Sequence, residues 1–170
     1  MKLIVLDRDG VINEDSANYI KTVEEWKAIP GSMEAIARLN RGGFRVVVAT
    51  NQSGISRGLF DLETLCAMHQ KMHKEASIVG GHIDGIFFLP HAPEDKCECR
   101  KPKPGLFKEI QARMSSRLEG VPVVGDSLRD LQAGASQGCL PFRGKNRQRP
   151  CKPLKSTRQN SPKAPWCSTT

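Results

Sequence analysis

Four short, continuous apolar runs limit what this chain can fold into more than any other feature of its sequence. These runs occupy residues 3–6, 44–49, 86–89 and 121–124. Runs that do not alternate with polar residues are typical of strands covered on both faces. The stretches between them have helical spacing and predict helices over residues 32–41, 61–78, 104–117 and 127–137. The alternation predicts an α/β, Rossmann-like fold, with a parallel sheet, right-handed crossovers and helices on both faces.

A cluster of polar residues follows each apolar run or lies in the loop beyond it. The clusters are Asp7-Arg8-Asp9-Gly10, Thr50-Asn51-Gln52-Ser53-Gly54, Cys99-Arg100-Lys101-Pro102 and Gly125-Asp126-Ser127. Ligands of open parallel sheets bind at the carboxyl ends of the strands. We therefore expect all four clusters to converge on one edge of the sheet and to form a single site.

The two aspartates at the end of the first run, Asp7 and Asp9, indicate phosphoryl-transfer chemistry. Carboxylates this close repel each other unless a cation lies between them or one of them holds a proton. Phosphoryl transfer uses both arrangements, because Mg²⁺ bridges a carboxylate and a phosphate oxygen while a second carboxyl group protonates the leaving alcohol. An aspartate can also take the phosphate as a nucleophile. For this motif alone, a solvated turn or a calcium-binding loop remains an alternative.

Residues in the other clusters strengthen this interpretation. Thr50 offers a hydroxyl group, followed by backbone amides that can bind phosphate oxygens. Lys101 supplies a positive charge that can balance the transferred group. Asp126 adds a third carboxylate for a metal ion, with Asp130 one helical turn later, although Asp126 could also cap the following helix. Each residue has an ordinary structural explanation by itself, but together and in this order they predict an active site.

The order of these motifs resembles the haloacid dehalogenase (HAD) superfamily of aspartyl-phosphate phosphatases. Leu6–Asn13, Thr50–Gly54 and Cys97–Pro102 are similar to the branch that contains D,D-heptose 1,7-bisphosphate phosphatases and histidinol phosphatases. The resemblance covers residues 1–139 and implies a single HAD phosphatase domain. It also implies that the helical cap domain of many relatives is absent, because the span 10–31 is too short for one.

The resemblance implies a role for each residue of the expected site. Asp7 would be the nucleophile and Asp9 the general acid and base, with Mg²⁺ bound by Asp7, the backbone carbonyl of Asp9, and Asp126. Thr50 and Lys101 would stabilise the phosphoryl group. Substrate contacts would come from Arg8, Asp15, Asn51, Gln52, Ser53 and Arg100. Arg100 would recognise a second phosphate or the sugar.

Two substrates are open within this branch. The 7-phosphate of D-glycero-D-manno-heptose 1,7-bisphosphate, in the synthesis of the lipopolysaccharide heptose precursor, is favoured because the resemblance to free-standing heptose enzymes extends through Asp126–Asp130. Histidinol phosphate is the alternative, but its phosphatase is usually fused to a dehydratase, and none follows here. Two alternatives belong to other classes: an unstable or inactive truncated HAD-like protein, and a binding protein that acts through its basic tail.

The branch also carries a structural zinc loop, and this chain matches three of its four ligands. His91, Cys97 and Cys99 fit the pattern, but Leu89 stands where the first cysteine belongs. Three protein ligands leave one zinc position open to water. We therefore expect weaker zinc binding, with a metal-free loop closed by packing as the alternative.

Three other residues on the expected helix over 61–78 have structural interpretations. Cys66 has core spacing and is interpreted as a packing residue. His69 and His73 lie four residues apart and could bind a metal ion, but no acidic ligand motif accompanies them. Both histidines are therefore interpreted as surface residues.

The net charge of +8 comes wholly from the end of the chain. Residues 1–139 hold 18 basic and 18 acidic side chains, so a nucleic-acid-binding face on the folded body is not indicated. Residues 140–170 hold 8 Lys or Arg, five prolines and no acidic residue. This tail predicts disorder from about Pro150 or a frameshifted terminus, and a sheet that lacks its last strand. Binding of nucleic acid or anionic lipid through the tail is the alternative.

The first apolar run, residues 3–6, is too short for a signal peptide or a membrane span. We therefore expect a cytoplasmic protein whose six cysteines are reduced. The expected enzyme is a monomer that acts on a small phosphorylated sugar and has no membrane partner.

Overall fold

Hydrogen bonds join five parallel strands into one sheet with the order β3-β2-β1-β4-β5. The computed structural model describes residues 2–144. The strands are β1 (Lys2–Leu6), β2 (Phe44–Asn51), β3 (Gly85–Leu89), β4 (Pro122–Gly125) and β5 (Leu140–Arg143). The helices between them are α1 (Ser32–Arg41), α2 (Leu62–Ile78), α3 (Gly105–Met114) and α4 (Leu128–Ala135). The four strands and four helices expected from the apolar pattern are confirmed, with ends shifted by a few residues.

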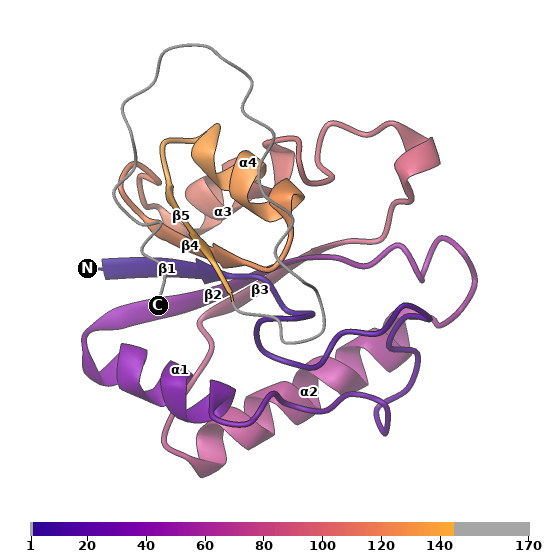
Figure 1. Cartoon of the computed structure of the whole chain (residues 1–170), viewed down its shortest axis with the longest axis horizontal. Helices are drawn as coiled ribbons and strands as arrows, with labels where there is room; N and C mark the ends of the chain where they lie inside the picture. The colour runs from indigo at the N-terminus through magenta and orange to yellow at the C-terminus, as the bar shows by residue number, and fades with distance from the viewer. Residues whose placement is uncertain (1, 145–170) are drawn as a thin grey trace, which may run out of the picture.

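Successive residues of the central strands face opposite layers of helices. In β1, Val5 packs in the same core as Phe107 of α3. Its neighbour Ile4 packs on the other face, in the core that contains Met68 of α2. Figure 1 shows α1 and α2 on one side of the sheet and α3 and α4 on the other. Because both faces are covered, these strands are apolar almost throughout, and the predicted α/β architecture is confirmed.

The segment between β1 and α1 forms no helical domain over the site. Residues 7–31 contain turns and isolated bridges but no helix. This segment is tied to α2 by Lys71, whose Nζ donates to the backbone oxygens of Val23 at 3.0 Å and Trp26 at 2.6 Å. The indole of Trp26 is fully buried beneath it. The carboxyl edge of the sheet therefore lies under a loop and not under a cap domain, as expected.

The sheet continues one strand beyond the expected boundary at residue 139. The N–H of Leu140 donates to the carbonyl of Val121 at 2.9 Å, and β5 then pairs in parallel with β4. The expectation that the last strand is missing is therefore wrong for residues 140–143. The apolar pattern gave little signal because this edge strand is held through its backbone, while the side chains of Leu140 and Phe142 are each 52% exposed.

Predictions about the tail fall outside the part of the chain that the structure describes. They concern disorder, a frameshift, or binding of nucleic acid or lipid by residues 145–170. Among residues 2–144, none of the helices combines the length and the apolar character needed to cross a membrane.

Candidate active site

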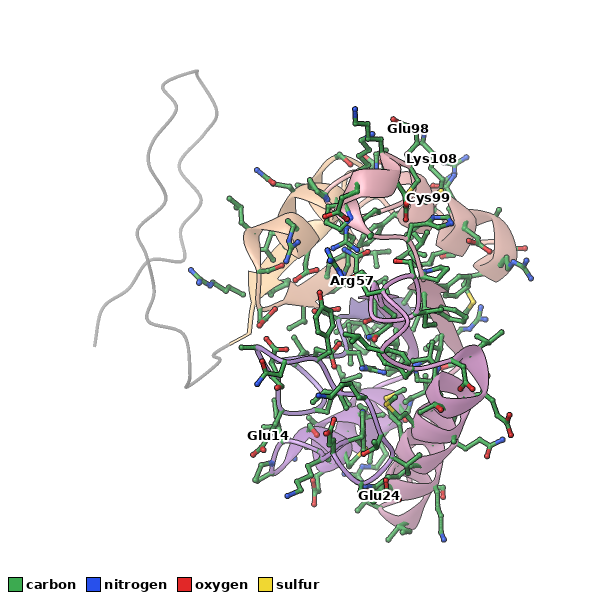
Figure 2. The ribbon with its side chains drawn as sticks, turned by 90° about the vertical axis from the view of Figure 1, so that its right-hand side faces the viewer. Glu14, Glu24, Arg57, Glu98, Cys99 and Lys108 are labelled. Atoms are coloured by element: carbon green, nitrogen blue, oxygen red, sulfur yellow. The ribbon has the colours of Figure 1, made fainter. Side chains whose placement is uncertain are left out.

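A cavity of about 340 Å³ lies at the carboxyl edge of the sheet. Its walls include most of the residues expected in the site: Asp7, Asp9, Asp15, Asn51, Gln52, Ser53, Arg100, Lys101 and Asp126. They come from the ends of β1, β2 and β4 and from the loop beyond β3. Figure 2 shows this side of the molecule, with Arg57 between Cys99 above and Glu14 below. The structure thus brings the four clusters together.

Asp7 lies directly after β1 and is buried. Its N–H donates to the carbonyl of Val124 in β4 at 2.8 Å, and its Oδ1 accepts from Lys101 Nζ at 2.9 Å. Burial, only partly offset by the positive charge of Lys101, raises the pKa of Asp7 to about 7, and the charges of Asp130 and Asp9 add to the rise. A cation beside this carboxyl group would therefore favour its charged form.

Lys101 lies buried between two carboxylates. Its Nζ is 2.9 Å from Asp7 Oδ1 and 2.5 Å from Asp130 Oδ1, and it also donates to the carbonyl of Ala49 at 2.9 Å. Burial disfavours the charged form of Lys101, but the two carboxylates outweigh it and raise the pKa of the ammonium group. The arrangement fixes a positive charge beside Asp7.

Asp130 holds Lys101 from the first turn of α4. Its Oδ2 accepts from the N–H of Ser127 at 3.1 Å and from the Ser127 hydroxyl at 2.6 Å, which leaves Oδ1 for Lys101. Burial opposes the charge of Asp130, but Lys101 and Ser127 outweigh it and keep the pKa of this carboxyl below its ordinary value. The sequence suggested only general support from Asp130, and its pairing with Lys101 was missed.

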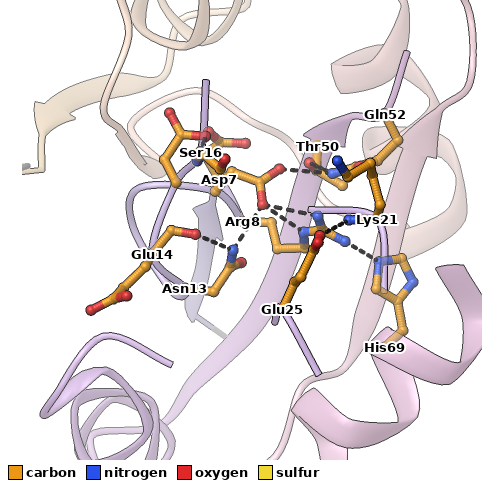
Figure 3. Close-up of polar contacts among 12 residues, drawn as sticks. Asp7, Arg8, Asn13, Glu14, Ser16, Lys21, Glu25, Thr50, Gln52 and His69 are labelled. Carbon is orange, nitrogen blue, oxygen red and sulfur yellow. Dashed lines mark hydrogen bonds and ion pairs between the residues drawn. The ribbon is translucent and has the colours of Figure 1, made fainter. Parts of the chain in front are cut away.

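The carboxylate of Asp9 is held at both oxygens. Oδ1 accepts from Arg8 Nη2 at 2.9 Å, from Arg8 Nε at 3.1 Å and from Asn13 Nδ2 at 2.9 Å. Oδ2 accepts from Gln52 Nε2 at 2.9 Å, and the same amide donates to Thr50 Oγ1 at 2.8 Å. Figure 3 shows Arg8, Asn13, Thr50 and Gln52 gathered in this part of the site. Asp9 is thus fixed before any substrate binds.

Arg8 and Thr50 are not among the residues that line the cavity. Arg8 is only 1% exposed, and its guanidinium group pairs with Asp9. The expected substrate contact of Arg8 is therefore corrected to a contact with Asp9. The Thr50 side chain is also buried, and its hydroxyl accepts from Gln52.

Three arginines, here called the arginine rim, lie around the same cavity: Arg57, Arg100 and Arg129. Arg57 pairs with Glu94 at 3.3 Å, and Arg100 Nη1 donates to the carbonyl of His91 at 2.9 Å. Burial and then the charge of Arg129 lower the pKa of Arg100, which indicates that the two guanidinium groups repel each other. Arg57 and Arg129 were not predicted as site residues: Arg57 lies just beyond Thr50–Gly54, and Arg129 lies within Asp126–Asp130 without any feature of its own.

One cluster in the described part of the chain has the geometry to bind a metal ion. Oxygens of Asp7, Asp126 and Asp130 lie within 4.8 Å of one another. Carboxylate oxygens are the ligands that Mg²⁺ prefers. Asp7 and Asp126 directly follow β1 and β4, which are neighbours in the sheet, so the order of the strands brings these two carboxylates to the same place.

The loop expected to bind zinc does not gather its ligands. His91 is exposed, while Cys97 and Cys99 are half-buried against the core, and these three side chains form no ligand cluster within residues 2–144. Leu89 packs into the core, and a short 3₁₀ helix, Pro93–Asp95, lies within the loop. The predicted zinc site is therefore not supported, because Leu89 packs into the core at the position where the fourth ligand would stand.

Two interpretations of residues on α2 are wrong. His69, expected at the surface, is only 8% exposed, and Cys66, expected in the core, is exposed. The buried stripe of α2 runs through Leu65, Met68 and Met72. At 3.6 residues per turn, this stripe includes His69 but leaves Cys66 to one side. His73 is exposed, as expected.

The fold and the site together define a class of protein, the HAD-type phosphatases. The features that define the class are an aspartate after the first strand, a second aspartate two residues later, a buried lysine and an aspartate after β4. A parallel α/β sheet places all four at one edge.

Comparison with known proteins agrees with this class. Residues 2–131 match the family model described as polynucleotide kinase 3 phosphatase. The D-glycero-beta-D-manno-heptose-1,7-bisphosphate 7-phosphatase of Bordetella bronchiseptica is 57% identical, over 84% of this chain and 79% of the relative. The corresponding protein of Pseudomonas putida is 52% identical, over 83% and 81%.

A solved structure shares the fold. It is the D,D-heptose 1,7-bisphosphate phosphatase of B. bronchiseptica complexed with magnesium and phosphate, with a TM-score of 0.84 and 55% identity over 87% of this chain and 84% of that one. The chain belongs to the heptose-bisphosphate phosphatase family of the HAD superfamily, and the resemblance seen in the sequence is confirmed.

Proposed function

We propose that this protein removes the 7-phosphate of D-glycero-D-manno-heptose 1,7-bisphosphate through a phosphorylated Asp7. The observation that carries the proposal is the buried Asp7 carboxylate beside the ammonium group of Lys101, at 2.9 Å, in a cavity with an arginine rim. A carboxylate can attack phosphorus, the lysine balances the charge of the transferred group, and the rim suits a second anionic group. The names of the relatives support the choice of sugar.

The proposed reaction has two steps. In the first, an oxygen of Asp7 attacks phosphorus and the bond to the sugar oxygen breaks, while Asp9 gives a proton to that leaving oxygen. In the second, Asp9 takes a proton from water, which attacks the acyl-phosphate and releases inorganic phosphate and the free carboxylate of Asp7. The four donors around Asp9 hold it in one orientation for both steps.

The cofactor we propose is Mg²⁺, held by Asp7, the backbone carbonyl of Asp9, and Asp126. The oxygen cluster that includes Asp7 and Asp126 fits this ion, and a relative of known structure binds magnesium together with phosphate. When bound, the ion supplies positive charge that lowers the repulsion between the carboxylate and the phosphate. Lys101 supplies the remaining positive charge, and the buried hydroxyl of Thr50 orients Gln52, whose amide also donates to Asp9.

Phosphate release from a panel of substrates tests the function. The panel contains heptose 1,7-bisphosphate, a hexose bisphosphate and histidinol phosphate, each with and without Mg²⁺. We expect kcat/KM for the heptose bisphosphate to exceed that for histidinol phosphate by about 10²-fold, because the arginine rim would lack its second anion in the latter. We also expect turnover to stop when Mg²⁺ is chelated. Faster hydrolysis of histidinol phosphate would overturn the choice of substrate.

Arg100 is proposed to bind the phosphate that is not transferred. Replacing it with Met should lower kcat/KM for the bisphosphate by about 10–100-fold, the value of a charge-assisted hydrogen bond. The same change should alter kcat/KM for the corresponding 7-monophosphate by about threefold at most, because that substrate lacks the second anion. The control is Arg113→Met, since Arg113 is exposed on α3 and pairs only with Glu109 among the described ion pairs. An equal decrease for both substrates would contradict this role.

A further inference from the structure

The guanidinium group of Arg8 has two partners on opposite edges. Its Nε and Nη2 donate to Asp9 Oδ1, whereas Nη1 lies 3.5 Å from Nε2 of His69 on α2. Figure 3 shows the His69 ring reaching from the helix toward this edge of Arg8. Both side chains are buried, so neither contact is replaced by bulk water. Within the described residues, Nε2 of His69 is therefore the side-chain acceptor on the edge of Arg8 that faces away from Asp9.

The ring of His69 is suited to this position. Burial, followed by the charge of Arg8, lowers the pKa of His69 to about 4, so the ring is neutral near pH 7. Because arginine can only donate, Nε2 must carry the lone pair and the ring proton must lie on Nδ1. The ring also makes an edge contact with Phe88 of β3, with centroids 6.1 Å apart. Its orientation is thus set by the helix and by a strand.

We propose that His69 is a positioning residue for Asp9, acting through Arg8. The proposal rests on the proposed function, in which Asp9 is the general acid and base. A buried guanidinium group that loses one acceptor is left with an unsatisfied donor, and it can recover a partner only by moving. Such a movement would shift the two donors that hold Asp9 Oδ1. Small displacements of a catalytic group are costly to the rate of the chemical step.

The chemistry of the leaving group separates this role from a merely structural one. A sugar alkoxide is a poor leaving group and needs a proton from Asp9. A 4-nitrophenolate ion is stable without that proton. A defect confined to Asp9 should therefore slow release of the sugar but not the first release of 4-nitrophenol from 4-nitrophenyl phosphate. A general loss of folding would slow both.

The experiment compares His69→Leu with the wild-type protein in rapid-mixing assays with Mg²⁺ on two substrates, heptose 1,7-bisphosphate and 4-nitrophenyl phosphate. We expect the rate constant for sugar release to fall about tenfold with KM within about twofold, and the initial burst of 4-nitrophenol to stay within about twofold. His69→Gln, whose amide can place an acceptor near the position of Nε2, should restore sugar release to within about threefold of wild type. His73→Leu, one turn along the exposed side of α2, serves as the matched control and should change neither rate.

Two results would overturn the proposal: an unchanged rate of sugar release in His69→Leu, or an equal loss for both substrates. If His69→Leu does not fold, the comparison of His69→Gln with His69→Asn decides. Asparagine has the same amide one methylene shorter, so Asn should be slower than Gln on the sugar substrate, and equal rates would reject the role. Asp9→Asn distinguishes a failure of this proposal from a failure of the proposed function. If Asp9→Asn hydrolyses heptose 1,7-bisphosphate at the wild-type rate, Asp9 is not the general acid, and the proposed function itself is wrong.

Discussion

Replacing Asp7 with Asn should lower the rate of phosphate release by about 10⁴-fold or more. An amide is a poor nucleophile toward phosphorus, and its nitrogen cannot bind a cation as a carboxylate oxygen does. The shape of the side chain is kept, and Lys101 retains its second carboxylate partner, Asp130. The rate would be measured as release of inorganic phosphate with Mg²⁺ present. In parallel, acid quenching after incubation with ³²P-labelled substrate would show whether the phosphate becomes attached to the protein.

The control for this variant is Asp61→Asn. Asp61 is the N-cap of α2, and its Oδ1 accepts from the N–H of Thr64 at 2.8 Å. Asparagine caps helices as well as aspartate does, so this change removes a carboxylate without removing the cap. Wild-type activity is expected. Label that still attaches to the Asp7→Asn protein would show that a different residue takes the phosphate.

The sequence was sufficient to predict the main strands and the convergence of the site because both depend on local pattern and on topology. Apolar runs such as residues 121–124 mark buried strands, and parallel strands bring their carboxyl ends to one edge. Asp7 and Asp126 follow two such strands, which are neighbours in the sheet. Their proximity in the structure follows from the order of the strands.

The pairings inside the site were not predictable in the same way. The contact of Arg8 with His69 joins residues 61 positions apart, and that of Lys101 with Asp7 joins residues 94 positions apart. Each depends on the direction that a side chain takes after the helices have packed. A buried histidine on a helix has the same spacing as an ordinary core residue, so the sequence could not show that His69 faces Arg8.

Two predictions failed, that of a missing last strand and that of a zinc site, and the failures have different physical causes. The strand β5 was missed because an edge strand can pair through its backbone without an apolar signal. Zinc binding by the loop was predicted because three residues match the ligand pattern, but a match in sequence does not bring the side chains together. In the structure Leu89 is part of the core, and among the described residues Cys97 and Cys99 form no common ligand cluster with His91.

A second large effect is expected for Lys101→Met, which keeps much of the side-chain volume and removes the charge. The rate of phosphate release should fall by about 10²–10³-fold, because the positive charge beside the transferred group is lost. The variant should also lose about 3–5 kcal/mol of stability near pH 8, since Asp7 and Asp130 would remain buried without their shared partner. The measurements are phosphate release and the midpoint of thermal unfolding.

The loss of stability should depend on pH in a defined direction. Burial already raises the pKa of Asp7 from 3.8 to about 7 in the presence of Lys101, and removal of the lysine raises it further. A carboxyl group whose pKa is higher in the folded state than in the unfolded state binds its proton more tightly in the folded state. The free energy of unfolding therefore falls as the pH rises from the unfolded pKa through the folded pKa. The difference in Tm between the wild-type protein and Lys101→Met should therefore be smaller at pH 5 than at pH 8.

Lys103→Met is the matched control for this prediction. Lys103 lies two residues further along, is partly exposed, and pairs with Glu98 at the surface at 2.6 Å. A surface pair of this kind contributes about 0–1 kcal/mol, so Tm and activity should change little at either pH. A Tm difference for Lys101→Met that is equal at pH 5 and pH 8 would contradict the electrostatic explanation. The stability of the site would then depend on the packing of the lysine stem and not on the charge between the two carboxylates.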